Sequence, residues 1–226
     1  MPPTTEAEPL RHAWHIDERE YERHVERRGR RHAFDELVPR RTAMVVIDMV
    51  PFFVEGLSSA PGVVPVINRL ADTTRHCGGI VAWVVPGDTA PSPARQEFLG
   101  PVVAETYRTS GGVGPPSQRV WSGMVQGAED LAFEKATASA FFPGSCRLDE
   151  TLRERQIDTV VIAGAVANVC VESTARDAAT LGYRVVMVAD AIAAVRDVDL
   201  NATLHTIYRS FGDVRSSEEI EALLTV

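Results

Sequence analysis

Lysine is almost absent from this chain. Of its 23 basic side chains, 22 are arginines and one is a lysine, Lys135. Arginine stays protonated and presents a planar fork, whereas lysine is a compact charge on a flexible stem with a movable proton. Because arginine serves wherever a charge only has to be solvated, the single lysine is a candidate for a chemical role. The alternative is that the arginine bias left one lysine over by chance.

Histidine and cysteine are also scarce. Only His76 and His205 lie beyond residue 41, which is too few for a His-rich metal site and removes the usual general base. The three cysteines have no paired spacing, which indicates reduced thiols rather than a disulfide framework: Cys77, Cys146 and Cys170. We therefore expect neither a metal nor another cofactor.

Long apolar runs and an excess of positive charge are missing as well. No stretch is long enough to cross a bilayer, and the N-terminus lacks the layout of a signal peptide. The formal net charge is −8, and residues 1–41 hold nine arginines against nine acidic residues. We expect a cytoplasmic protein that binds neither membranes nor nucleic acid, with 1–41 as a charged N-terminal arm.

From residue 42 onward, short β-branched runs alternate with longer amphipathic stretches, which is typical of strand–helix–strand units around a parallel sheet. The length and the 45% apolar content suit one α/β domain over 42–226. We expect a doubly wound, mostly parallel, Rossmann-like sheet with the strand order 3-2-1-4-5-6 and helices on both faces. Its six strands fall at 42–48, 79–85, 129–134, 159–164, 184–190 and 212–214.

A segment rich in proline, glycine and serine, at 86–126, separates the second strand from the third and is too long for an ordinary connection. Phe98, Tyr107 and Trp121 give it apolar surface to bury. We expect it to cover a site or to pack on another subunit, and the sequence leaves both roles open. A disordered excursion is the alternative.

Three chemically interesting side chains fall at the carboxyl ends of predicted strands. Asp48 ends the first strand, Lys135 follows the third, and Cys170 follows the fourth at the start of a helix. In doubly wound sheets ligands bind at this edge, where the winding reverses. A helix N-terminus and a nearby lysine would lower the pKa of the thiol, and Asp48 is the group available to take its proton. Taken singly, Cys170 also fits a small buried hydrophobe and Asp48 a turn residue.

The segments around these residues resemble the isochorismatase-like cysteine hydrolases, in particular the branch that contains N-carbamoylsarcosine amidase and ureidoacrylate amidohydrolase. The resemblance spans 42–214 and rests on three motifs in family order: VVIDM at 45–49, KATASAF at 135–141 and GAVANVCVESTARDA at 164–178. It implies a catalytic triad with Asp48 as acid and base, Lys135 as the charge that tunes the pair, and Cys170 as the nucleophile. It also implies a homo-oligomer, either a dimer or a tetramer.

The same resemblance implies a cis peptide bond just before the nucleophile turn, at Val166–Ala167. Such a bond would aim the backbone N–H groups of Ala167 and Cys170 at the oxyanion that develops during acyl transfer. Both groups are thus implied as an oxyanion hole.

The sequence also departs from the family pattern. The run Met49-Val50-Pro51-Phe52-Phe53 replaces the polar residues that often follow the acid, which suggests an apolar mouth. The Asp-x-His metal motif of the nicotinamidase branch is missing after the second strand, so nicotinamide hydrolysis is disfavoured. Apolar residues generally line small-molecule sites, and three candidates here are equally compatible with core packing: Phe53, Trp121 and Phe141.

We therefore expect an amidase that cleaves a C–N bond of a small amide, lactam, ureide or carbamoyl compound through a thioester-type intermediate. One alternative is vinyl-ether hydrolysis of the isochorismate type, in which Asp48 does the work without a thiol. Another is a non-catalytic binding or redox-responsive module with Cys170 as an oxidisable thiol, because one fold hosts many functions.

Overall fold

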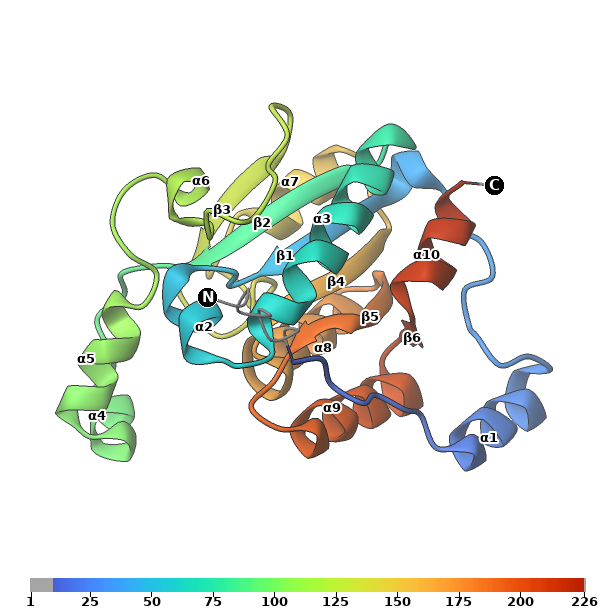
Figure 1. Cartoon of the computed structure of the whole chain (residues 1–226), viewed down its shortest axis with the longest axis horizontal. Coiled ribbons are helices and arrows are strands. Elements are labelled where there is room, and N and C mark those ends of the chain that lie inside the picture. The colour runs from blue at the N-terminus through green and yellow to red at the C-terminus, as the bar shows by residue number, and fades with distance from the viewer. Residues whose placement is uncertain (1–9, 226) are drawn as a thin grey trace, which may run out of the picture.

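The computed structural model describes residues 10–225, and its centre is a six-stranded parallel sheet (Figure 1). The strand order is β3-β2-β1-β4-β5-β6, which confirms the predicted doubly wound topology. The strands are β1 Thr42–Ile47, β2 Ile80–Pro86, β3 Leu131–Lys135, β4 Thr159–Ala165, β5 Arg184–Ala193 and β6 Asp213–Arg215. No helix within 10–225 combines the length and apolarity needed to cross a membrane.

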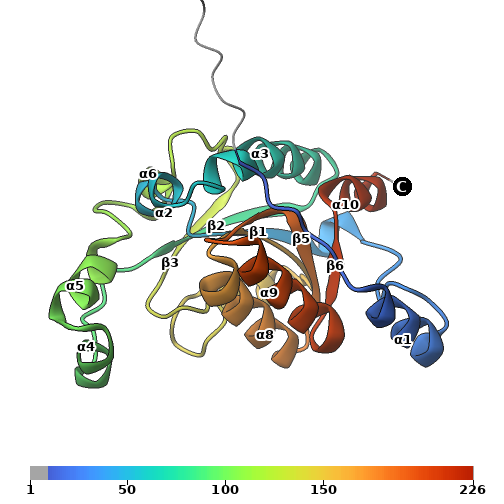
Figure 2. The same ribbon diagram turned by 60° about the horizontal axis from the view of Figure 1, so that its bottom comes forward.

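Helices cover both faces of the sheet, as Figure 2 shows. One face carries α3 (Ala60–His76) and α10 (Ser217–Leu224), and the other carries α7 (Leu148–Glu154), α8 (Glu172–Thr180) and α9 (Asp197–Ser210). Along β1, Met44 and Val46 pack into the cluster that contains α3, while Val45 and Ile47 pack into the cluster that contains α8 and α9. Burial on both faces explains why the strands read as near-continuous apolar runs.

The N-terminal segment packs against the body. Asn201 on α9 accepts a hydrogen bond from the backbone N–H of His15 (2.8 Å) and donates one to the carbonyl of Ala13 (3.0 Å). After helix α1 (Glu18–Arg28), the buried carboxylate of Asp213 on β6 accepts bonds from two backbone N–H groups, those of residues 33 and 34. Polar side chains of the body thus hold this segment, and the boundary between arm and domain stays a prediction.

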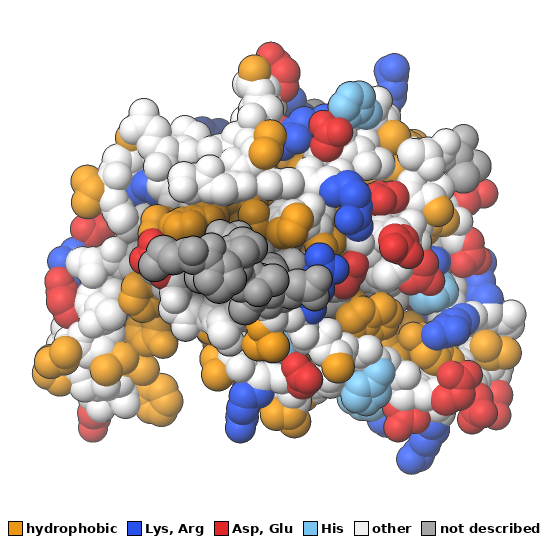
Figure 3. Space-filling view, in the orientation of Figure 1, with side chains coloured by type: hydrophobic (Ala, Val, Ile, Leu, Met, Phe, Trp, Pro, Cys, Tyr) orange, Lys and Arg blue, Asp and Glu red, His pale blue; other side chains and the backbone are white. Residues whose placement is uncertain are grey.

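The long segment between β2 and β3 contains three helices that the sequence analysis did not foresee. They are α4 (Pro93–Leu99), α5 (Pro101–Thr109) and α6 (Pro116–Arg119), and each begins with the proline that suits a first helical turn. Helices α4 and α5 project from the body and expose apolar side chains, among them Phe98 (85% exposed) and Val102 (77%) (Figure 3). Whether they cover the site or meet another subunit stays open.

Aromatic and ionic contacts tie this segment to the body. The ring of Tyr107 on α5 lies 6.1 Å from that of Phe52 on α2 (Pro51–Gly56). The buried guanidinium of Arg119 donates to the carbonyl of Pro86 (3.0 Å) and pairs with Glu134 on β3. The segment is therefore anchored at the carboxyl ends of β2 and β3.

Close packing of β1 and β4 depends on one glycine. Gly164 has φ +113°, a conformation that L side chains rarely adopt, and a Cβ there would lie 2.1 Å from the carbonyl oxygen of Ile47. The register of β4 against β5 also shifts between Ile162 and Gly164. The residue after Ile47 is Asp48, so the tight approach lies directly beside a predicted site residue.

We predict that Gly164→Ala lowers the free energy of unfolding by about 2 kcal/mol or more, since the new methyl group meets backbone that cannot move away. Urea denaturation followed by circular dichroism measures this. The control is Gly56→Ala at the end of α2, where a Cβ meets nothing within 4 Å. Equal, small losses in both variants would show that the β1–β4 junction tolerates a side chain.

Candidate active site

Asp48 sits directly after β1 in a left-handed backbone conformation, with φ 53°. Aspartate visits this region more readily than most residues. The backbone N–H of Asp48 bonds to the carbonyl of Val84 on β2 (2.8 Å), and its own carbonyl accepts from Val50 (2.9 Å). The side chain is fully buried at the carboxyl edge of the sheet.

Lys135 is the last residue of β3 and its ammonium is also buried, with the residue 4% exposed. Its Nζ lies 2.9 Å from Oδ2 of Asp48, 3.5 Å from Sγ of Cys170 and 3.2 Å from the carbonyl oxygen of Thr137. The contacts with Cys170 and Thr137 are hydrogen bonds, and the contact with Asp48 is an ion pair. The long stem lets the charge reach from β3 past the end of β2 to the residue that follows β1.

Cys170 lies in a single wide helical turn, Ala167–Val171, between β4 and α8. Such turns are rare and often occur at functional sites. The structure thus brings Asp48, Lys135 and Cys170 together, as the sequence predicted. Cys170 is 9% exposed and Asp48 is not exposed at all, so the sulfur is the more accessible of the two.

The cis peptide bond expected at Val166–Ala167 lies one bond earlier, at Ala165–Val166. The reason is the length of β4, which pairs with β5 through Ala165 and leaves Val166 alone to connect the strand to the turn. The carbonyl of Val166 accepts hydrogen bonds from Val169 (3.1 Å) and Val171 (3.3 Å). The role of the N–H groups of Ala167 and Cys170 as an oxyanion hole stays a prediction.

The pKa of the thiol moves opposite to expectation. Burial, followed by the negative charge of Asp48, raises the pKa of Cys170 well above its ordinary value, against the opposing effect of Lys135. The sequence-based expectation considered the lysine and the helix but not the buried carboxylate. The resting state is therefore a protonated thiol next to an ion pair.

Burial also raises the pKa of Asp48, although Lys135 and the hydrogen bond from Cys170 oppose the change. Lys135 pairs with Oδ2 of Asp48 at 2.9 Å, but within 10–225 neither carboxylate oxygen has a hydrogen-bond partner of good geometry. For Lys135, burial alone would lower the pKa, but the charges of Asp48 and Cys170 raise it above the ordinary lysine value. Asp48 is thus a better base than an exposed carboxylate, and Lys135 keeps its proton.

The three candidate substrate-binding residues lie in different places. Phe53 is half-buried on α2, and its ring is 5.0 Å from that of Phe52. Trp121 is half-buried and its backbone N–H donates to the carbonyl of Met49 (2.7 Å), next to Asp48. Phe141 is 2% exposed and packs in the core with its ring 5.1 Å from Tyr183, so we assign it to packing.

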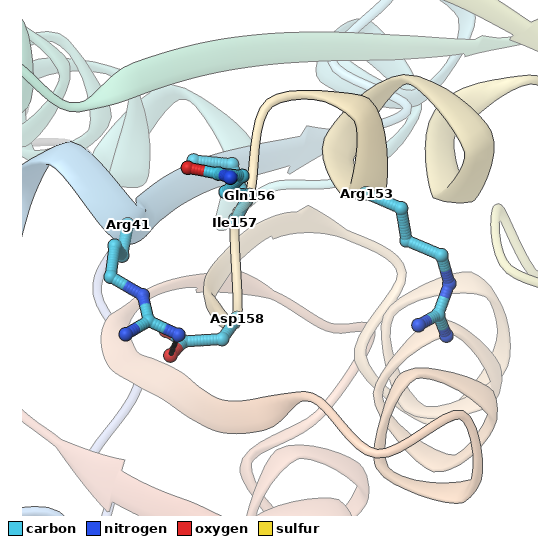
Figure 4. Close-up of a pocket in the computed structure, with 5 residues that line it drawn as sticks. All are labelled: Arg41, Arg153, Gln156, Ile157 and Asp158. Carbon is cyan, nitrogen blue, oxygen red and sulfur yellow. Dashed lines mark ion pairs between the residues drawn. The ribbon is translucent and has the colours of Figure 1, made fainter.

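Two surface pockets lie away from the cluster of Asp48, Lys135 and Cys170. The first is lined by Arg41, Arg153, Gln156, Ile157 and Asp158 (Figure 4). Arg41 and Asp158 form an ion pair (2.6 Å) just before β1 and β4 begin. This is the end of the sheet opposite to the carboxyl ends of the strands, where the clustered residues lie. The second pocket, which includes Phe142, Cys146 and Arg147, likewise contains none of the three clustered residues.

The sequence analysis missed the third partner of the ammonium, the carbonyl of Thr137, and the side chains that hold it. These are hydroxyl residues in the loop after β3 and on α8: Thr137, Ser139, Ser145 and Thr174. The high serine and threonine content of 137–145 was the available signal. No group of three or more His, Cys, Asp or Glu within 10–225 is arranged to hold a metal.

The charges of Asp48 and Lys135 act in opposite directions on the pKa of Cys170, so removing each charge should have the opposite effect on Cys170 alkylation. Asp48→Asn removes the charge that disfavours the thiolate, so the midpoint of the pH dependence of Cys170 alkylation should fall by about one unit or more. Lys135→Met should raise it. Iodoacetamide labelling with peptide mapping by mass spectrometry measures both, and Asp72→Asn on the exposed face of α3 is the control. A higher midpoint in Asp48→Asn would show that the charge of Asp48 does not disfavour the thiolate of Cys170.

Comparison with known proteins agrees with this fold and with the motifs. The Isochorismatase domain family model matches residues 42–219. An uncharacterised isochorismatase family protein of Bacillus subtilis (strain 168), YwoC, is 33% identical over 184 residues, which cover 80% of this chain and 92% of that protein.

Solved structures give the same result. A cysteine hydrolase from Pseudomonas syringae pv. phaseolicola 1448A superimposes with a TM-score of 0.73 at 25% identity, covering 86% of this chain and 96% of that one. An N-carbamoylsarcosine amidase from Thermoplasma acidophilum superimposes with a TM-score of 0.63 at 29% identity, covering 79% and 97%. The chain belongs to the isochorismatase family.

Proposed function

We propose that this protein is a cysteine hydrolase that cleaves a C–N bond of a small amide, lactam, ureide or carbamoyl compound. The observation that carries the proposal is the buried contact of Lys135 with both Asp48 and Cys170, at 2.9 and 3.5 Å. The similarity to a cysteine hydrolase and to an amidase supports the reaction class.

The first half of the reaction uses the proton of the thiol. When a carbonyl group lies beside Sγ, Asp48 takes the thiol proton and the sulfur attacks the carbonyl carbon. The ammonium of Lys135 remains charged and stabilises the thiolate as it forms. We propose that the backbone N–H groups of Ala167 and Cys170 bind the resulting oxyanion.

The second half releases both products. The tetrahedral intermediate collapses as Asp48 returns the proton to the leaving nitrogen, which departs as ammonia or an amine and leaves an acyl- or carbamoyl-thioester on Cys170. Water then attacks this thioester while Asp48 accepts its proton, and the sulfur leaves with that proton. Each cycle thus returns Asp48 and Cys170 to their starting protonation states.

A protonated resting thiol fits this sequence of steps. Burial raises the pKa of Asp48 and so makes this carboxylate a stronger base than an exposed one, while the pKa of the thiol is raised as well. A permanent thiolate would need a lowered pKa at Cys170, which the buried carboxylate opposes. The geometry therefore favours a nucleophile that is activated only when a substrate is present.

The apolar residues near Asp48 provide the proposed walls of the substrate site. Phe53 lies on α2, shortly after Asp48 in the chain. The backbone of Trp121 bonds to Met49, the residue next to Asp48. We also propose a reducing, cytoplasmic location, which the three free cysteines support, and a homo-oligomer, which the exposed apolar side chains of α4 and α5 support.

We predict turnover of at least one compound in a panel of small amides, lactams, ureides and carbamoyl compounds, measured as release of ammonia or an amine, or as ring opening for a lactam. Cys170→Ala should lower kcat by about a thousandfold or more, because the step that forms the thioester is lost. Cys77→Ala, at a half-buried thiol directly after α3, is the matched control and should keep the activity. A quenched reaction should show the acyl group on the peptide that contains Cys170.

Two results would contradict the proposal. Full turnover in Cys170→Ala with loss in Asp48→Asn would favour the vinyl-ether chemistry, in which the acid acts alone. Absence of turnover across the panel, together with reversible oxidation of Cys170 that changes ligand binding, would favour the redox-responsive module.

A further inference from the structure

The loop between β3 and α7 is folded around hydroxyl groups. The backbone N–H of Thr137 donates to Oγ of Ser145 (3.1 Å), and that hydroxyl donates to the carbonyl of Ser139 (3.1 Å). The hydroxyl of Thr137 lies 3.0 Å from both acceptors, Ser139 O and Ser145 Oγ. Ser145 is 7% exposed whereas Thr137 is exposed, so these bonds lie partly buried at the surface of the protein.

This loop contacts Lys135 and the helix that follows Cys170. At one end, the carbonyl of Thr137 accepts a hydrogen bond from the Lys135 ammonium (3.2 Å). At the other end, the backbone N–H of Ala140 donates to the hydroxyl of Thr174 (3.2 Å), which is fully buried on α8, one turn after Cys170. The loop therefore connects the strand of the lysine to the helix of the cysteine.

We propose that Ser145 is a positioning residue: by folding this loop, its hydroxyl aims the carbonyl of Thr137 at Lys135 and so keeps the ammonium in contact with Cys170. The proposal rests on the proposed function, because it assigns Lys135 a role in thiol activation. No contact of Ser145 with Lys135 or Cys170 is required.

The physical argument starts from the flexibility of lysine. Its side chain has four rotatable bonds and is a point charge without a preferred plane, so only its acceptors fix the position of Nζ. Asp48 at 2.9 Å is the strongest of the three partners, and without Thr137 the ammonium is free to turn toward the carboxylate. Because the Coulomb interaction falls with distance, a longer Nζ–Sγ separation stabilises the thiolate less.

Removing the Ser145 hydroxyl takes away the acceptor of the Thr137 N–H and of the Thr137 hydroxyl. It also removes one of the two donors to the carbonyl of Ser139, which keeps the hydroxyl of Thr137. Three hydrogen bonds that tie the loop together are lost, so the loop is expected to rearrange. Threonine at this position keeps a hydroxyl in the same place and supplies a conservative rescue.

The experiment measures the pH dependence of Cys170 alkylation by iodoacetamide, mapped by mass spectrometry, in Ser145→Ala and Ser145→Thr. The matched control is Ser59→Ala, since Ser59 is also buried and also donates to a backbone carbonyl, that of Ala194 (2.8 Å). Thermal unfolding of each variant is recorded in parallel. The assay needs no substrate, so it remains interpretable even if no amide is hydrolysed.

For Ser145→Ala we expect the alkylation midpoint to rise by about one pH unit, and the rate at a fixed pH below it to fall about tenfold. Ser145→Thr should stay within about twofold of the unmodified protein. Ser59→Ala should lose stability without moving the midpoint. Thr137→Val, which keeps the carbonyl but removes one hydroxyl of the network, should shift the midpoint in the same direction by less.

The proposal is overturned if Ser145→Ala and Ser59→Ala lose similar stability and both keep the original midpoint. It is also overturned if threonine fails to restore the midpoint, because the hydroxyl would then not be the group that matters. If Ser145→Ala yields no folded protein, Thr137→Val decides, and an unchanged midpoint there overturns the proposal.

Discussion

The buried ion pair of Asp48 and Lys135 is the interaction on which the site depends. Taking two charges out of water is costly, and a buried pair is tolerated when its remaining donors and acceptors are matched. Here the ammonium pairs with the carboxylate and donates hydrogen bonds to the thiol and to the carbonyl of Thr137, whereas neither oxygen of Asp48 has a hydrogen-bond partner within 10–225. The five donors of a guanidinium would exceed the partners available to the cation. The surroundings therefore suit the one lysine of the chain better than an arginine.

The sheet topology is what makes the pair possible. Strand β1 has β2 and β4 as neighbours, so the residues that follow β1 and β4 meet directly, while β3 lies one strand further away. Only a long side chain at the end of β3 spans that separation. The tight packing at Gly164 brings β4 close to Ile47, and the turn that contains Cys170 begins three residues later. Backbone packing thus sets the distances on which the proposed proton transfer depends.

Most of the framework was predictable, because it follows from local patterns. Continuous apolar runs indicated the strands, and their alternation with helices indicated the parallel order. Other features depend on contacts between distant segments. The position of the cis bond follows from how far β4 pairs with β5, and the burial of Phe141 follows from Tyr183 at the other edge of the sheet. The helices of 86–126 were hidden by the proline content, although proline favours their first turns.

The sequence by itself determined which residues are chemically exceptional: one lysine, an aspartate after an apolar strand, and a cysteine before a helix. The tertiary structure decided what they do to one another. The pKa of the thiol is raised rather than lowered because the thiol is buried and, second, because a fully buried carboxylate lies beside it; neither feature is encoded in local sequence. The same holds for two ordinary loop residues, Thr137 and Ser145. The bond from Lys135 to the carbonyl of Thr137, and the bond from Thr137 to the hydroxyl of Ser145, arise only when the loop folds back over the end of the sheet.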